Sequence, residues 1–260
     1  VNKMDMVGYS QGIFDDIVRQ YLAFARQVGL ESIVPIPMSA LRGDNITELS
    51  ANTPWYDGPT LMGHLETAVI ADGAANAPFR MPVQWVNRPN SEFRGFAGTI
   101  ASGTIRLGDR VRVLPSGKES RVKEILSAAS GWPGSATPQA AAEEAVAEQS
   151  VTLVLEDEID ISRGSVIARA DSPPGVADQF EVTLIWMAEE PMLPGRQYWI
   201  KLGTRTAIGA VTELKYKINV NTLEKLAAKT LELNEIGVAN LSLDQQVAFD
   251  PYAHNRDTGG

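Results

Sequence analysis

Four of the first five residues have types and spacing that could recognise a purine base. In Asn2-Lys3-Met4-Asp5, a carboxylate stands three positions after an amide, at a point where we expect a strand to end. The Asp5 carboxylate can accept two parallel hydrogen bonds from guanine N1–H and the exocyclic amino group, a donor pair that adenine lacks. The Asn2 amide can serve the other edge of the purine, and the aliphatic stem of Lys3 can lie over its face. By itself, so short a pattern is more typical of a solvated loop.

A second pattern, Ser39-Ala40-Leu41, bears on the same base. It follows the next expected strand, so that a helix and a strand separate it from residues 2–5. In GTP-binding domains this spacing brings a second loop to the base, where a backbone N–H can donate to guanine O6. The two patterns together favour a guanine site over a solvated loop.

Helices and a strand are expected around these two patterns. Apolar residues recur at helical spacing from Gln11 to Gly29, with Ser10 at the N-cap position and Gly29 at the C-terminal position. The β-branched run at 32–36 predicts a buried strand, and a second helix follows the turn-rich stretch 54–59. The apolar face of that helix comprises Leu61, Met62, Leu65 and Ala68. This helix–strand–helix order is typical of the end of an α/β domain.

The sequence pattern changes after about residue 70. Residues 71–77 are small and polar and predict a linker, and alternation with period two begins at Phe79. One side of this first strand comprises Phe79, Met81, Val83 and Trp85, and the other comprises Arg80, Pro82 and Gln84. Short strands then follow with glycine-containing turns, interrupted by an expected long surface loop at 128–149. Pro173-Pro174-Gly175 marks a second boundary, so the layout predicts two β-barrels.

The composition narrows the class of protein. With 260 residues, 44% of them apolar and 21% charged, the chain has room for about two globular domains. It has no cysteine, which excludes disulfides and cysteine-ligated metals within it and suits a reducing cytoplasm. No apolar run approaches the roughly 18 residues of a transmembrane helix. The net charge of −9 has the wrong sign for a general nucleic-acid binder.

Several long stretches of the sequence resemble one protein family. They are PWYDGPTL at 54–61, VNRPNSEFRGFAGTIASGTIRLGD at 86–109, VLPSGKESRVKEI at 113–125, LEDEIDISRG at 155–164, WMAEEPMLPGRQY at 186–198 and NEIGVANLSLDQQVAFDPYAHNRDTGG at 234–260. They resemble the GTPase subunit (subunit 1, the large subunit) of bacterial sulfate adenylyltransferase, a relative of translation elongation factor Tu. Generic translation factors share the architecture of this family but not these stretches.

The resemblance implies a mixed fold class, in which the C-terminal remnant of an α/β P-loop GTPase domain is followed by two β-barrels, as in elongation factor Tu. The implied domains are the end of the GTP-binding domain at 1–70, a first barrel at 71–172 and a second barrel at 173–260. We expect the second barrel to lack its last strand. The implied guanine-binding residues are Asn2, Lys3, Met4, Asp5, Ser39, Ala40 and Leu41.

The resemblance also implies a function. Proteins of this family couple GTP hydrolysis to the formation of adenosine 5′-phosphosulfate from ATP and sulfate, as regulatory subunits of a cytoplasmic nucleotidyltransferase in sulfate assimilation. A separate, smaller catalytic subunit carries out the adenylyl transfer and is the implied partner in a heteromeric complex. GTP and magnesium are implied ligands of the intact protein, whereas neither a membrane nor nucleic acid is expected as a partner.

The sequence departs from the family at the groups that handle phosphate. The P-loop pattern G-x-x-x-x-G-K-[ST] is absent, since Arg112 stands where Gly117-Lys118 would need its first glycine. The elements that position magnesium and the γ-phosphate are expected before Val1, which predicts a fragment without the N-terminal half of its GTP-binding domain. We therefore expect these 260 residues to contain no catalytic or metal-binding residue, and to neither bind nor hydrolyse GTP alone.

Further patterns suggest chemistry, and for each we favour a plainer explanation. Gly8-Tyr9-Ser10-Gln11-Gly12 matches the nucleophile-elbow pattern G-x-S-x-G, but Ser10 is expected to cap a helix. The acidic run at 156–160 lacks the spacing of an EF-hand and predicts a solvated turn. His64 is expected on the polar side of its helix, and His254 lies in a final loop without catalytic partners.

The segment 80–123 is basic within an acidic chain. Its nine positive side chains against Glu92, Asp109 and Glu119 give a net charge of +6. The polar outer face of a barrel is the simpler interpretation, and a docking face for an acidic partner or RNA is the alternative. Two other functions stay open: a translation-factor-like GTPase that binds RNA through its barrels, and a non-catalytic partner-docking module. The acidic total disfavours RNA.

Overall fold

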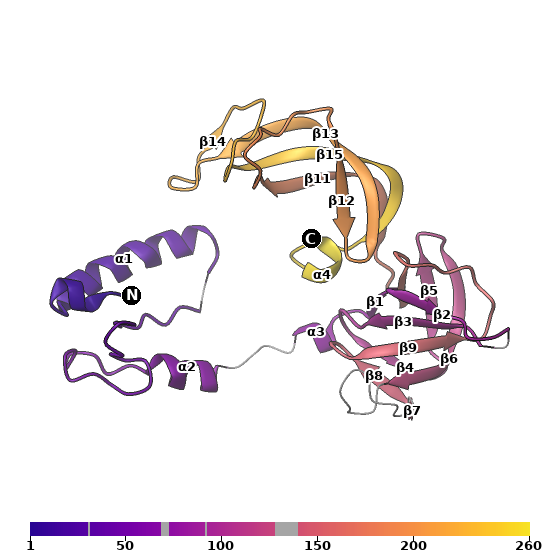
Figure 1. Ribbon diagram of the computed structural model, residues 1–260, viewed down its shortest axis with the longest axis horizontal. Coiled ribbons are helices and arrows are strands. Elements are labelled where there is room, and N and C mark those ends of the chain that lie inside the picture. The colour runs from indigo at the N-terminus through magenta and orange to yellow at the C-terminus, as the bar shows by residue number, and fades with distance from the viewer. Residues whose placement is uncertain (31, 69–72, 92, 128–139) are drawn as a thin grey trace. The chain divides into compact units, whose positions relative to one another are not determined.

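The computed structural model describes residues 1–30, 32–68, 73–91, 93–127 and 140–260. They form two compact units, one spanning Val1–Ala71 and the other Asp72–Gly260 (Figure 1). The first unit contains helices and irregular segments, whereas the second consists mainly of antiparallel strands. The predicted mixed fold class is confirmed. A boundary near residue 172 and the expected loss of a last strand stay predictions.

The helices of the first unit are capped as the sequence predicts. They are the 3-10 helix η1 (Met4–Val7) and the α-helices α1 (Gln11–Gln27) and α2 (Leu61–Thr67). Ser10 Oγ accepts the Ile13 N–H at 3.5 Å and so caps α1. Beyond α1, Gly29 has φ +75°, and Leu30 N–H donates to Ala25 O at 2.9 Å. The N-cap and the C-terminal glycine are both confirmed.

The run at 32–36, predicted to be a buried strand, is not a strand. Up to position 35 its backbone makes no hydrogen bond to another backbone group among the described residues, and Val34 is 44% exposed. Pairing begins at its end, where the Val1 nitrogen donates to Ile36 O at 2.7 Å and Met38 N–H donates to Val1 O at 2.9 Å. A β-branched run becomes a strand only where a neighbour supplies the ladder. Here the pairing is short, but it places residue 39 beside residues 2–5.

The first part of the second unit is an antiparallel barrel. Its strands are β1 (Arg80–Pro82), β2 (Trp85–Asn87), β3 (Gly95–Thr99), β5 (Arg110–Leu114), β6 (Lys118–Ser127), β7 (Ala140–Ala142), β9 (Ser150–Leu155) and β10 (Val166–Arg169), with the pair β4 (Thr104–Arg106) and β8 (Glu144–Val146). The sheet follows the order β1-β10-β5-β6-β9-β3-β2, with β7 beside β6. Because β1 and β2 are successive in the chain yet lie at opposite ends of this order, the sheet closes on itself. Its interior is apolar, with Met81, Ile125 and Leu153 fully buried.

The alternation predicted from Phe79 onward ends before Trp85. Phe79, Met81 and Val83 are buried together, but Trp85, which was predicted on the same side, is 65% exposed. The Val83 N–H bonds to the β10 side of the sheet and the Gln84 N–H to β3, so the chain changes partners between them. This change of partner breaks the period-two pattern on which the prediction depended.

Two loop predictions for this region also need correction. The expected linker at 71–77 contains the short helix α3 (Gly73–Asn76). In the expected loop at 128–149, residues 140–142 and 144–146 are strands, because alanine-rich segments pair here with β6 and β4. Residues 128–139 lie outside the described residues.

The second part of this unit is a five-stranded antiparallel sheet. Its strands are β11 (Gly175–Ile185), β12 (Gln197–Leu202), β13 (Arg205–Ile218), β14 (Lys225–Leu226) and β15 (Ile236–Phe249). The order is β11-β15-β13-β12, with β14 beside β13. Met192, Leu231 and Ala239 are buried in its core, and the predicted alternation at 180–186 supplies half-buried apolar residues. The short helix α4 (Arg256–Gly259) follows β15.

A buried ion pair joins the barrel to the end of this sheet. Arg80, predicted on the outer polar side, is 4% exposed. Its Nε and Nη2 donate to Asp250 Oδ2 and Oδ1 at 2.8 and 3.0 Å, because β1 lies where the chain crosses to the second sheet. Burial alone would raise the pKa of Asp250, but hydrogen bonds from Arg80 and Thr258 outweigh it and hold that pKa below its ordinary value.

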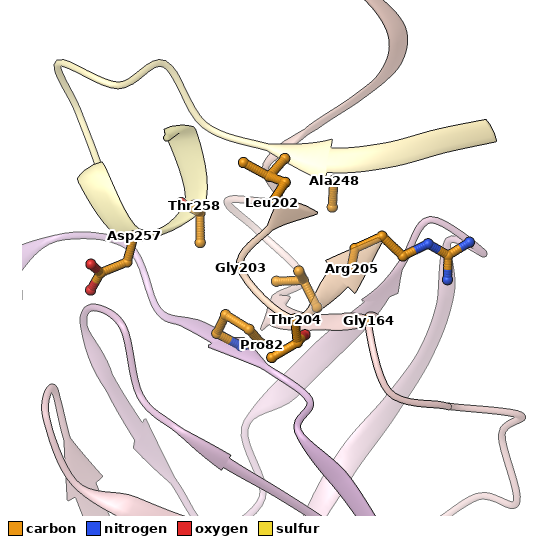
Figure 2. A pocket seen from close by; sticks show the side chains of 10 residues that line it. Pro82, Gly164, Leu202, Gly203, Thr204, Arg205, Ala248, Asp257 and Thr258 are labelled. Atoms are coloured by element: carbon orange, nitrogen blue, oxygen red, sulfur yellow. The ribbon is translucent and has the colours of Figure 1, made fainter. Parts of the chain in front are cut away.

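A small cavity accompanies this junction. It has a volume of about 10 Å³ and is lined by residues of both parts, among them Pro82, Gly203 and Thr258 (Figure 2). That volume suits about one water molecule. The junction is therefore a packed structural contact and not a nucleotide site.

Candidate functional site

The two short sequence patterns lie next to each other in the first unit. Ser39 Oγ donates to Asp5 Oδ1 at 2.7 Å, and Ala40 N–H donates to Asn2 Oδ1 at 3.0 Å. Asn2 Oδ1 also accepts the Lys3 N–H at 2.7 Å. Residues that are 34 and 38 positions apart in the sequence are thus joined directly. The two loops therefore form one continuous polar surface.

Several polar groups of this surface have no hydrogen-bond partner among the described residues. They are Asp5 Oδ2, Asn2 Nδ2 and the Leu41 N–H. Guanine offers an amino group and N1–H as donors, and O6 and N7 as acceptors. A carboxylate oxygen with amide and backbone N–H donors is therefore complementary to that base.

Lys3 and Met4 differ in their surroundings. Lys3 is exposed and has φ +65°, a left-handed conformation that costs a non-glycine residue roughly 1–2 kcal/mol. The Met4 side chain is 1% exposed, and its N–H donates to Met38 O at 3.1 Å. Met4 therefore anchors the loop in the interior of the unit, whereas Lys3 stays at its surface.

Sequence reasoning missed a polar cluster beside this surface. Asn45 is fully buried, and its Nδ2 donates to Pro37 O at 2.6 Å and to Thr53 Oγ1 at 2.9 Å. Its neighbour Asp44 is 8% exposed. Hydrogen bonds from Ser50 and then Tyr9 hold the pKa of Asp44 below its ordinary value, and the bond to Asp44 raises the pKa of Tyr9. The turn-type triplet Gly43-Asp44-Asn45 is the signal that could have found it.

Ser10 and the acidic run adopt the plainer roles that we favoured. Ser10 caps α1, which is not the geometry of a nucleophile elbow. In the acidic run, Asp157 Oδ2 accepts the Ser120 hydroxyl at 2.8 Å, and Asp160 pairs with Arg94 at 3.4 Å. Within the described part of the chain, no three histidine, aspartate or glutamate residues are grouped as a metal site requires.

Five of the nine positive side chains in the stretch 80–123 form ion pairs with described residues. Arg110 and Arg112 both pair with Glu119 at 2.6 Å, and Arg106 pairs with Glu144. An open hollow of about 440 Å³ lies over this face. The charged residues that line it are Arg110, Arg112, Arg121, Arg169, Asp109, Glu119 and Asp171. Three carboxylates offset four guanidinium groups there, as the polar outer face of a barrel predicts.

Comparison with known proteins shows what this chain resembles. A family model described as GTP-eEF1A C-terminal domain-like matches residues 179–260. Sulfate adenylyltransferase subunit 1 of Aliarcobacter butzleri is 48% identical over 260 residues, an alignment that covers 100% of this chain. The chain resembles sulfate adenylyltransferase subunit 1. The bifunctional enzyme CysN/CysC of Xylella fastidiosa, 50% identical over 259 residues, also aligns with 100% of the chain.

The chain aligns with only part of the length of each of these relatives. The chain covers 53% of the Aliarcobacter subunit 1 and 40% of the Xylella enzyme. The name subunit 1 implies a partner subunit for the proteins that bear it. The resemblance predicted from the sequence is confirmed across the whole chain.

Solved structures show the same fold at low sequence identity. A crystal structure of sup35 complexed with GDP aligns with 99% of this chain and 63% of that chain, with a TM-score of 0.64 and 20% identity. Elongation factor SelB from Methanococcus maripaludis, in complex with the GTP analogue GppNHp, aligns with 96% of this chain and 52% of that chain, with a TM-score of 0.54 and 18% identity. The fold is therefore that of the elongation-factor-Tu-like GTPases. None of the helices described for this chain has the length and hydropathy needed to cross a bilayer.

Proposed function

We propose that this protein acts as the regulatory GTPase subunit of sulfate adenylyltransferase (ATP sulfurylase). In this role it couples GTP hydrolysis to the formation of adenosine 5′-phosphosulfate from ATP and sulfate. Relatives named sulfate adenylyltransferase subunit 1, 46% and 48% identical to the chain, support this function. The structural observation that carries the proposal is the joining of the two loops through Ser39–Asp5 and Ala40–Asn2.

The proposed guanine-binding residues have distinct roles. Asp5 accepts the guanine N1–H and amino group, and the Ser39 hydroxyl orients its carboxylate. The Asn2 amide serves the other edge of the base, while the Lys3 stem covers its face. Because Ala40 N–H already donates to Asn2, the backbone donor to guanine O6 is the Leu41 N–H. Met4 holds the loop in the interior.

GTP, magnesium and a partner belong to the proposal for the intact protein. The described residues fit the base and not the triphosphate, since no P-loop pattern occurs in the 260 residues. When bound, GTP would supply the phosphorus atom that is attacked in hydrolysis, and magnesium would offset the charge of its phosphates. The residues described here would hold only the guanine base. The partner we propose is the small catalytic adenylyltransferase subunit, in the cytoplasm.

Exchanging the carboxylate of Asp5 tests the base assignment. In the full-length protein we expect Asp5→Asn to weaken GTP binding by about 10-fold to 100-fold, since hydrogen bonds to a charged group contribute about 1.5–3 kcal/mol each. The variant should bind xanthosine triphosphate more tightly than the wild type does, because the amide donates to the extra carbonyl of xanthine. Competition between GTP and xanthosine triphosphate for a fluorescent nucleotide measures both changes.

The matched control is Asp15→Asn, which alters an exposed aspartate of α1 in the same unit. It should leave both affinities unchanged. An Asp5→Asn variant that keeps the wild-type preference for guanine would show that Asp5 does not contact the base.

A further inference from the structure

We propose that Tyr9 and Asp44 form a clamp that holds the two guanine-binding loops in register, with Asp44 as a positioning residue for base recognition. The proposal rests on the proposed function and adds residues that do not contact the nucleotide. It follows from a ring of hydrogen bonds that runs from one loop to the other and back.

Asp44 uses both of its carboxylate oxygens within the unit. Oδ2 accepts the Tyr9 hydroxyl at 2.7 Å. Oδ1 accepts the Ser50 hydroxyl at 2.5 Å and the Asn52 amide at 3.0 Å. With three donors on a side chain that is 8% exposed, Asp44 is held in one orientation.

The backbone of Asp44 controls the loop that contains Ser39. Asp44 O accepts the Ser39 N–H at 3.3 Å, and Gly43 N–H donates to Ser39 O at 2.8 Å, which closes a tight turn at 39–44. Ser39 is fully buried in that turn, and its hydroxyl reaches Asp5. A shift of Asp44 is therefore transmitted to the carboxylate that is proposed to bind guanine.

Tyr9 connects the same aspartate to the other loop. Its N–H donates to Met4 O at 2.9 Å, directly beside Asp5, and its carbonyl accepts the Trp55 indole N–H at 3.1 Å. The ring thus closes through Asp5, Ser39, Asp44, Tyr9 and Met4. The two loops meet directly at Ser39–Asp5 and Ala40–Asn2, and Tyr9–Asp44 joins them once more.

Three of the six non-glycine residues with positive φ in the described part of the chain lie at this place. Lys3, Tyr9 and Asn45 have φ of +65°, +55° and +56°, in the left-handed region. Asparagine adopts this conformation readily, but for bulky residues such as Lys3 and Tyr9 it is rare and persists only where the surrounding contacts enforce it. All three residues lie in the two loops or directly beside the clamp.

Removing the Tyr9 hydroxyl tests the clamp in the full-length protein. For Tyr9→Phe we expect the GTP dissociation rate to rise about 3-fold to 10-fold. The variant loses one hydrogen bond to the charged Asp44 carboxylate, but the other donors to that carboxylate compensate in part. The ratio of GTP to inosine triphosphate affinity should fall. Inosine lacks the exocyclic amino group, so a misplaced Asp5 costs GTP more than it costs the inosine nucleotide.

Two companion variants separate positioning from general stability. Tyr56→Phe removes an exposed hydroxyl that donates to Pro59 O at 2.8 Å in the same unit, and it should leave the affinity ratio unchanged. Ser50→Ala removes another donor to Asp44 without touching Tyr9, and it should lower the ratio by a smaller factor. Ser50→Ala also decides the question if Tyr9→Phe does not fold.

The outcomes distinguish this inference from the proposed function. If the wild type prefers GTP while both clamp variants keep the wild-type ratio, the clamp is refuted and the proposed function stands. Equal losses of affinity for both nucleotides would also refute it, because they indicate reduced stability and not lost positioning. A wild type that does not bind guanine nucleotides would refute the proposed function itself.

Discussion

The first unit and the barrel are stabilised by different kinds of buried groups. Among the described residues of 1–71, buried polar side chains accompany the apolar ones. The polar set is Ser39, Asp44, Asn45 and Thr53, and the apolar set is Met4, Phe14, Ala25, Ile36 and Pro37. The interior of the barrel is instead one continuous cluster of hydrophobic side chains, which includes Phe96, Ile125 and Leu153.

This difference predicts which changes each region tolerates. A hydrophobic core is stabilised by buried area and close packing, which depend on volume and not on direction. A buried hydrogen-bond network needs each donor and acceptor at a defined distance and angle. Recognition of a base also requires hydrogen-bonding groups at defined distances and angles, and the polar interior of the first unit lies beside the proposed site.

The largest effect is expected for a cavity in the barrel. Phe96 is 2% exposed in the core cluster, and Phe96→Ala should lower the free energy of unfolding by about 3–5 kcal/mol. Trp85→Ala, in the neighbouring strand and 65% exposed in the native protein, should change it by about 0.5 kcal/mol or less. Urea unfolding of both variants measures the difference. Similar losses for the two would contradict a core that depends on volume.

A smaller loss of stability is expected at the buried ion pair of the barrel, which is an exception to its otherwise hydrophobic interior. Arg80→Ala leaves the Asp250 carboxylate buried with its hydrogen bond from Thr258, and should lower the free energy of unfolding by about 3 kcal/mol. Arg196→Ala removes the exposed partner of Glu190, and should cost about 1 kcal/mol or less. Thermal unfolding compares the two. An equal loss of stability in the two variants would show that the Arg80–Asp250 pair is exposed to water in solution.

The smallest effect isolates the polar network of the first unit. Thr53→Val keeps the side-chain volume but removes the acceptor of the Asn45 amide, and should cost about 1–3 kcal/mol. Trp55 is the one tryptophan in residues 1–71, so variants that retain only this tryptophan report the unfolding of that unit by fluorescence. Thr67→Val, at an exposed position of α2, is the matched control. Equal stability of the two variants would mean that side-chain volume determines the stability of the first unit as it does that of the barrel.

Local signals in the sequence predicted local features. Ser10 and Gly29 bound α1 because a cap depends on backbone groups within a few positions. Two predictions were wrong: the strand at 32–36, and the placement of Trp85 on the same side as Phe79, Met81 and Val83. Each depends on which neighbour supplies the ladder. The guanine-binding roles of the seven candidate residues stay predictions, although the structure brings the two loops together.

By itself, the sequence determined the mixed fold class, the family resemblance and the pair of patterns at 2–5 and 39–41. Their residue types and spacing carry those signals without any knowledge of distant contacts. Only the tertiary structure decided that Tyr9 bonds to Asp44 and that Arg80 is buried against Asp250, 170 positions away. The physical reason is that a hydrogen bond or ion pair acts over about 3 Å. Which distant side chains come within that range depends on how the complete chain packs.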